Sequence, residues 1–175
     1  MEFLIMVVAV IAIALGAWIF LGGVGSTAQD EIMDRRVPGM TKIMISAPST
    51  ANVGDTVEVT VKIVGARNLF LYIMYLNFNN AVLNHQPATQ GDFLAGGWFG
   101  SNFIPPNKIG CAAYKTDVDG NFIGTSGSGI LFKVEFIANS EGTSEFTLSD
   151  IQLFDPTMTP ITDYYVDSDS ITINP

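Results

Sequence analysis

Two hydrophobic patterns divide this chain. Residues 3–21 (FLIMVVAVIAIALGAWIFL) form an unbroken apolar run, whereas apolar and polar residues alternate from Lys42 onward. A helix over residues 3–24 would be roughly 33 Å long, enough to cross a bilayer. Because it would be apolar on every face, it must be buried in lipid or among protein partners. The later alternation is typical of strands with one buried face. We therefore predict an apolar N-terminal helix followed by a β-rich domain.

Small and polar residues follow the apolar run. Gly22, Gly23 and Gly25 each weaken a helix by about 1 kcal/mol relative to alanine, so they predict a hinge. The capping-box spacing at Ser26–Gln29 favours a short second helix. The chain therefore divides into three expected parts: an apolar helix (1–25), a short polar helix with a linker (26–40) and one β domain (41–175).

Period-two alternation locates the expected strands of the β domain. Val57, Val59, Val61 and Ile63 alternate with polar residues, and Gly, Asn, Asp and Pro separate this segment from others like it. Residues 68–78 are almost continuously apolar, which predicts a central strand. We expect strands near residues 43–45, 57–63, 68–78, 82–85, 108–115, 129–138, 143–148, 151–154 and 169–173. This spacing is typical of an all-β sandwich.

Composition narrows the function classes. The formal net charge is −9, so nucleic acid and anionic lipid surfaces are unfavourable partners. The only cysteine, Cys111, cannot form an internal disulfide and lies in an apolar strand, where a buried, unreactive thiol is expected. The only histidine, His85, ends a short strand, so any multi-histidine metal centre is excluded. No catalytic constellation is present, and we expect no enzyme activity.

One string has the residue types of a cation site. Asp117, Asp119 and Asn121 alternate with other residues around a glycine, as in the first half of a calcium-binding loop. The closing acid of such a loop is absent, because position 128 is a serine. Asp119-Gly120 is equally a strong turn signal. Two interpretations therefore stand, a hairpin turn and a Ca²⁺ site, and no other cofactor is expected.

A second segment has aromatic residues in a setting typical of a loop. Residues 96–106 carry Trp98, Phe99 and Phe103 between glycines and prolines. Such rings can stack on sugars or anchor a partner protein. They can equally fold onto their own domain or onto a neighbouring subunit.

Five strings in the β domain together resemble the cohesin family, in the family's order. They are Val53-Gly54-Asp55-Thr56-Val57, Asn68-Leu69-Phe70, Gly91-Asp92-Phe93-Leu94, Ser126-Gly127-Ser128-Gly129-Ile130-Leu131, and Glu141-Gly142-Thr143 with Leu148-Ser149-Asp150-Ile151. The resemblance covers roughly residues 41–175. It implies a mainly β, jelly-roll sandwich of about nine strands. In cellulosomes such domains bind dockerin modules, and the same fold occurs elsewhere, often on cell surfaces.

The apolar run resembles a second family, the type IV pilin-like filament subunits, which include archaeal pilins and archaellins. Bacterial members carry Glu at the fifth mature position, whereas Ile5 stands here, so the archaeal branch fits better. We expect Met1 to follow a removed leader, the alternative being that it is the initiator. The resemblance implies a helical homopolymer whose core would contain Phe3, Ile5, Val8, Ala9, Ala12, Leu15, Gly16, Ile19 and Phe20.

Two functions follow from these expectations. The first is a structural subunit of an extracellular archaeal-type filament, inserted in the membrane before assembly, with the β domain exposed for surface contact or adhesion. Its physical basis is that each large apolar side chain contributes about 1.5–3 kcal/mol when it is buried. Outside lipid, the apolar helix can bury these side chains only in a bundle of identical helices. The alternative is a membrane-anchored cohesin-like module that binds a dockerin or a glycan.

Overall fold

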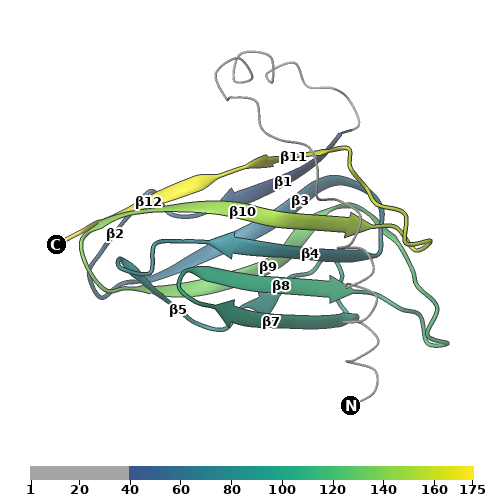
Figure 1. Ribbon diagram of the computed structural model, residues 1–175, viewed down its shortest axis with the longest axis horizontal. Helices are drawn as coiled ribbons and strands as arrows, with labels where there is room; N and C mark the ends of the chain where they lie inside the picture. The colour runs from purple at the N-terminus through teal and green to yellow at the C-terminus, as the bar shows by residue number, and fades with distance from the viewer. Residues whose placement is uncertain (1–39) are drawn as a thin grey trace. The chain divides into compact units, whose positions relative to one another are not determined.

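Twelve strands account for most of residues 40–175, the part of the chain that the computed structural model describes (Figure 1). The alternating residues of the sequence form these strands because each strand buries one face. Their bounds are β1 (Thr41–Ser46), β2 (Thr50–Asn52), β3 (Thr56–Leu69), β4 (Leu71–Asn77), β5 (Leu83–His85), β6 (Thr89–Gln90), β7 (Trp98–Ile104), β8 (Lys108–Tyr114), β9 (Thr125–Ala138), β10 (Gly142–Phe154), β11 (Tyr164–Asp167) and β12 (Asp169–Asn174).

The strands form two sheets that pack face to face. The first, called here the β3 sheet, has the order β11-β1-β3-β9-β5, and β6 also pairs with β9. The second, called here the β4 sheet, has the order β2-β12-β10-β4-β8-β7. Figure 1 shows β10, β4, β8 and β7 in front of β1, β3 and β9. Pairing is antiparallel except for β1 with β11 and β12 with β2, which are parallel.

The core lies between the sheets. In β4, Tyr72, Met74 and Leu76 are fully buried and alternate with half-buried residues. The hydroxyl of Tyr72 donates a hydrogen bond of 2.9 Å to the carbonyl oxygen of Leu131 in β9, which joins the two sheets. Burial raises the pKa of this hydroxyl. Within residues 40–175, no buried side-chain nitrogen or oxygen lacks a hydrogen-bond partner.

The Gly91–Leu94 segment has a structural role. A Cβ atom at Gly91 would lie 2.1 Å from the carbonyl oxygen of Ile130, so only glycine fits there. Asp92 Oδ1 accepts a 2.6 Å hydrogen bond from the backbone N–H of Ile130, and Phe93 and Leu94 are buried. This string therefore attaches a connecting segment to β9.

The structure confirms a mainly β sandwich but corrects three expectations. Residues 68–78 are not one strand, because Asn68 has a φ of 53° and the chain changes from the β3 sheet to the β4 sheet at Phe70. The expected strands 143–148 and 151–154 are one strand, β10, with a bulge between them. The expected loop 96–106 contains strand β7, which pairs with β8 along its whole length.

The strand count rises from about nine to twelve because β7 and three short strands at sheet margins, β2, β6 and β11, are added, while two expected strands merge into β10. The predicted apolar helix, hinge and polar linker fall on residues 1–40 and lie almost entirely outside the described residues. In the part that is described, no helix has the length and apolar character needed to cross a membrane.

Candidate protein-binding face

The outer surface of the β4 sheet carries a cluster of apolar side chains on β4, β8 and β7. Along β4, the buried Tyr72, Met74 and Leu76 alternate with residues that must point outward, because successive side chains of a strand lie on opposite faces. The same alternation applies to β8, and the pairing of β7 with β8 brings Trp98 opposite Tyr114. The resulting surface, called here the aromatic face, consists of Leu71, Ile73, Tyr75, Trp98, Ala112 and Tyr114.

Two glycines let rings lie against the backbone of this face. A Cβ atom at Gly100 would lie 2.6 Å from Cη2 of Trp98, so the indole covers Gly100. A Cβ atom at Gly110 would lie 3.1 Å from Cε1 of Tyr75. The Trp98 and Tyr114 rings also stack, with centroids 5.4 Å apart and planes inclined by 21°. Trp98 remains 42% exposed, so the face offers accessible ring surface.

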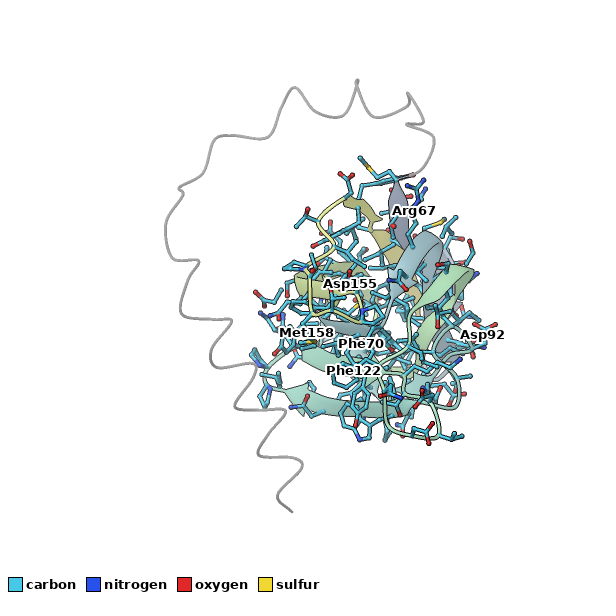
Figure 2. The ribbon with its side chains drawn as sticks, turned by 90° about the vertical axis from the view of Figure 1, so that its right-hand side faces the viewer. Arg67, Phe70, Asp92, Phe122, Asp155 and Met158 are labelled. Atoms are coloured by element: carbon cyan, nitrogen blue, oxygen red, sulfur yellow. The ribbon has the colours of Figure 1, made fainter. Side chains whose placement is uncertain are left out.

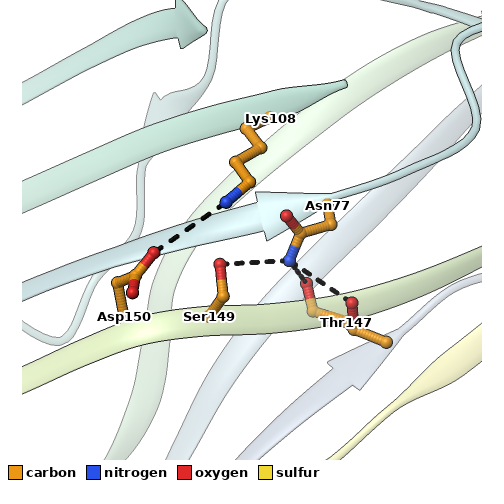
Figure 3. Close-up of polar contacts among 5 residues, drawn as sticks. All are labelled: Asn77, Lys108, Thr147, Ser149 and Asp150. Atoms are coloured by element: carbon orange, nitrogen blue, oxygen red, sulfur yellow. Dashed lines mark hydrogen bonds and ion pairs between the residues drawn. The ribbon is translucent and has the colours of Figure 1, made fainter. Parts of the chain in front are cut away.

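A polar margin lies beside the aromatic face and is made of Asn77 of β4, Lys108 of β8, and Thr147, Ser149 and Asp150 of β10 (Figure 3). The bulge in β10 places Asp150, with a φ of 51°, so that its Oδ2 is 3.9 Å from Nζ of Lys108. Asn77 Nδ2 donates to the carbonyl oxygen of Thr147 at 3.1 Å and to the hydroxyls of Thr147 and Ser149, each at 3.3 Å. Directional polar groups therefore border the apolar surface, as at protein interfaces.

The opposite outer surface, on the β3 sheet, has a different chemistry. Lys133 Nζ lies 3.0 Å from Oε1 of Glu58, and Lys42 forms an ion pair with Asp167. The hydrogen bond from Lys42 to Asp167 raises the pKa of the lysine. Exposed pairs of this kind keep a sheet surface solvated and contribute little to stability. Of the two outer faces, only that of the β4 sheet carries a cluster of aromatic side chains.

A hollow of about 400 Å³ next to the polar margin is open and lined mainly by polar residues, among them Asn77, Asn79 and Thr143. A buried small-molecule site would instead be enclosed and mostly apolar. Within residues 40–175, no group of three or more His, Cys, Asp or Glu side chains is placed to hold a metal ion.

The three aromatic residues predicted as partner contacts do not all lie on one face of the β4 sheet. Trp98 lies on the aromatic face, whereas Phe99 points inward and packs against the core. Phe103 stacks on His85 with ring centroids 4.2 Å apart and remains 38% exposed. The separation follows from strand β7, because neighbouring residues in a strand face opposite ways. The sequence did not identify Ile73, Tyr75 and Tyr114 as candidate site residues, because their only signal was that they alternate with core positions.

The Asp117–Asn121 segment has the geometry of a turn. Asp117 Oδ1 accepts hydrogen bonds from the backbone N–H groups of Asp119 and Asn121, at 2.9 and 2.8 Å. Its Oδ2 accepts one from Asn121 Nδ2 at 2.9 Å. These bonds, that from the Asn121 side chain first, hold the pKa of the Asp117 carboxyl below its usual value. Both carboxylate oxygens of Asp117 therefore accept hydrogen bonds within the turn.

The same turn occurs a second time at Asp155–Thr159. Asp155 Oδ1 accepts from the hydroxyl of Thr157 and from the backbone N–H groups of Thr157 and Thr159, at 2.7, 2.8 and 3.0 Å. Figure 2 shows Asp155 and Met158 on this segment, at the end of the sandwich where Phe122 stacks on Phe70. The ring centroids of that pair are 4.2 Å apart. Both turns therefore close strand connections.

Cys111 is buried, as predicted. It is 2% exposed in β8, and desolvation raises the pKa of its thiol to about 12. At neutral pH the group is therefore a thiol and not a nucleophilic thiolate. The residues predicted for a filament core and hinge, Phe3 to Phe20 and Gly22 to Gly25, lie outside the described residues.

These residues define the chain as a two-sheet β sandwich with aromatic side chains on one outer sheet face. The model of the cohesin domain family matches residues 41–173, and the chain belongs to that family. The comparison with curated proteins gave no match.

Solved structures share the fold. A non-cellulosomal cohesin from the archaeon Archaeoglobus fulgidus is 23% identical, with a TM-score of 0.67 over 78% of this chain and 92% of that one. A type II cohesin from the cellulosome of Acetivibrio cellulolyticus is 19% identical, with a TM-score of 0.66 over 75% and 95%. A type I cohesin in complex with a dockerin, from Clostridium thermocellum, is 15% identical, with a TM-score of 0.65 over 77% and 93%.

Proposed function

We propose that this chain is a non-catalytic binding module of the cohesin family, displayed outside the cell, which binds a dockerin module through the aromatic face. The observation that carries the proposal is the contrast between the two outer sheet surfaces. One is covered by half-exposed rings and aliphatic side chains, and the other by charged pairs. Family membership and the solved cohesin–dockerin complexes support a dockerin as the partner.

The energetics of the aromatic face suit protein contact. Aromatic residues that become fully buried at the centre of an interface are common hot spots, each contributing 2 kcal/mol or more. Trp98 and Tyr75 already lie against glycine backbone, so little conformational freedom remains for a partner to remove. The aromatic face is therefore preorganised for a complementary apolar surface.

The polar margin has the charged and hydrogen-bonding groups needed to orient a bound partner. Lys108 and Asp150 are both exposed and carry opposite charges, and Asn77 presents its amide beside them. Charges at the rim of an interface change association rate and specificity more than affinity. We infer that the margin sets the direction in which the partner lies on the sheet.

The test is direct binding of dockerin modules from the organism that produces this chain, measured by calorimetry with calcium present. We expect one or more to bind, and Ile73→Asp to weaken that binding by about thirtyfold, equivalent to about 2 kcal/mol. A buried, unpaired carboxylate at the centre of the interface is the physical reason.

Val64→Asp is the matched control. Val64 is also a β-branched residue on an outer sheet surface, but it lies on the β3 sheet and is 41% exposed. Binding should survive this change. Equal loss in both variants, or binding of glycans on an array with no dockerin bound, contradicts the proposal.

A second candidate function is the filament subunit, favoured by the apolar run over residues 3–21. Helices of this composition associate through small residues, and the run contains Ala9, Ala12 and Gly16. Head-to-tail contacts between copies do not close, so they generate a fibre. In this candidate the β domain would coat the fibre, and the aromatic face would serve surface contact.

A further inference from the structure

The free edge of β7 lacks the features that normally protect an edge strand. Edge strands are usually kept from pairing with other chains by short length, charged residues, proline or bulges. In the described residues β7 pairs only with β8. It contains seven residues, none of them charged or proline, and its register with β8 is uninterrupted from Trp98 to Ile104.

The other margins of the two sheets are protected. At the remaining sheet ends, β2 and β5 have three residues each and β11 has four, one of them Asp167. β6 has two residues. The open edge of β7 is therefore a specific feature of this strand.

We propose that β7 pairs with β7 of a second copy of this chain, in antiparallel register about Ser101. The sequence WFGSNFI is complementary to itself in that register. Trp98 would lie opposite Ile104 of the other copy, Phe99 opposite Phe103, and Gly100 opposite Asn102. Phe103, 38% exposed in the single chain, would gain an aromatic cross-strand neighbour, and such pairs contribute roughly 0.2–1 kcal/mol each.

Charge also favours a second copy at this edge. Two copies of a chain with a net charge of −9 repel each other over most of their surface. Strand β7 carries no charge, so like charges do not face each other across the proposed pairing. An antiparallel pair has its two-fold axis perpendicular to the sheet, so the contact is the same on both copies and closes at two.

The proposed dimer would also change how the chain binds a dockerin, a consequence that rests on the proposed function. Because the axis is perpendicular to the sheet, the aromatic faces of both copies would point to the same side of one continuous sheet. A partner with two binding modules could then engage both, and its second contact would be intramolecular.

The test uses residues 38–175, since all core residues in the described part of the chain lie between 43 and 173 and the apolar run could itself associate. By analytical ultracentrifugation we expect a concentration-dependent dimer. Ser101→Lys should leave only monomer, because two lysines would face each other across the axis. Ser46→Lys, at an exposed position on β1, is the control and should remain dimeric.

A second variant keeps the test decisive if the lysine disturbs folding. Ser101→Cys in the full chain should form an intermolecular disulfide in air, whereas Ser46→Cys should not. Ser101 lies directly opposite Cys111 of β8, so both cysteine variants also carry Cys111→Ala, which removes an intramolecular disulfide as a competing product. A monomer at all concentrations, a dimer that survives Ser101→Lys, or equal crosslinking at positions 46 and 101 overturns the pairing. Dockerin binding by the monomer would leave the proposed function intact.

Discussion

The two five-residue turns, Asp117–Asn121 and Asp155–Thr159, differ at one conformationally demanding residue. In both, the first Asp accepts backbone N–H groups from the third and fifth residues, and its own N–H donates to the fifth residue's carbonyl. The fourth residue has positive φ in each: 85° at Gly120 and 62° at Met158. A residue with a Cβ pays roughly 1–2 kcal/mol in that region, whereas glycine does not.

This comparison gives a prediction for single residues. Met158→Gly should raise the free energy of unfolding by about 1 kcal/mol, because relief of the left-handed conformation outweighs the greater freedom of glycine in the unfolded chain. Gly120→Ala should lower it by a similar amount. Urea denaturation of the two variants measures both changes. Effects of the same sign would show that the turns are not equivalent.

At the scale of elements, the buried hydrogen bond from Tyr72 in β4 to Leu131 in β9 links the two sheets. Tyr72→Phe should lower the free energy of unfolding by about 1 kcal/mol. The loss is moderate because the carbonyl oxygen of Leu131 also accepts from the N–H of Gly91 at 2.9 Å and stays satisfied. Tyr75→Phe, on the outer side of the same strand, is the control and should be close to neutral. Thermal denaturation that ranks the two variants equally would contradict a cross-sheet role.

At the scale of the whole molecule, the apolar run and the β domain have separable roles. If the aromatic face alone binds the partner, residues 38–175 should bind the same dockerin with a Kd within about threefold of that of the full chain, a difference below 1 kcal/mol. Calorimetry on both proteins measures this. A much weaker isolated domain would show that residues 1–37 belong to the binding site.

The filament candidate is tested with the full chain and with a variant that lacks residues 1–25. Material sheared from cells that produce the full chain should contain fibres in negative-stain electron microscopy. Deletion of residues 1–25 should abolish them, because that segment would form the fibre core. Sheared material without fibres that contain this chain would rule out the candidate, whatever the outcome for dockerin binding.

Much of the β domain could be predicted from local patterns. Alternation from Val57 to Ile63 indicated a strand with one buried face, and the hydrogen-bonded strand β3 contains it. The apolar surroundings of Cys111 indicated burial, and the thiol is buried. Glycine and proline spacing failed at residues 96–106, because both residue types also border strand β7, where pairing with β8 overrides the local loop signal.

In the strands that its alternation revealed, the sequence by itself determined which residues share a face, and thereby much of the core and the class of fold, because a strand alternates strictly between two sides. Only the tertiary structure decided which strands are neighbours. Trp98, Tyr75 and Tyr114 are far apart along the chain, and the register of β4, β8 and β7 brings them onto one surface. Register depends on long-range hydrogen bonds and packing between strands, which no local pattern records.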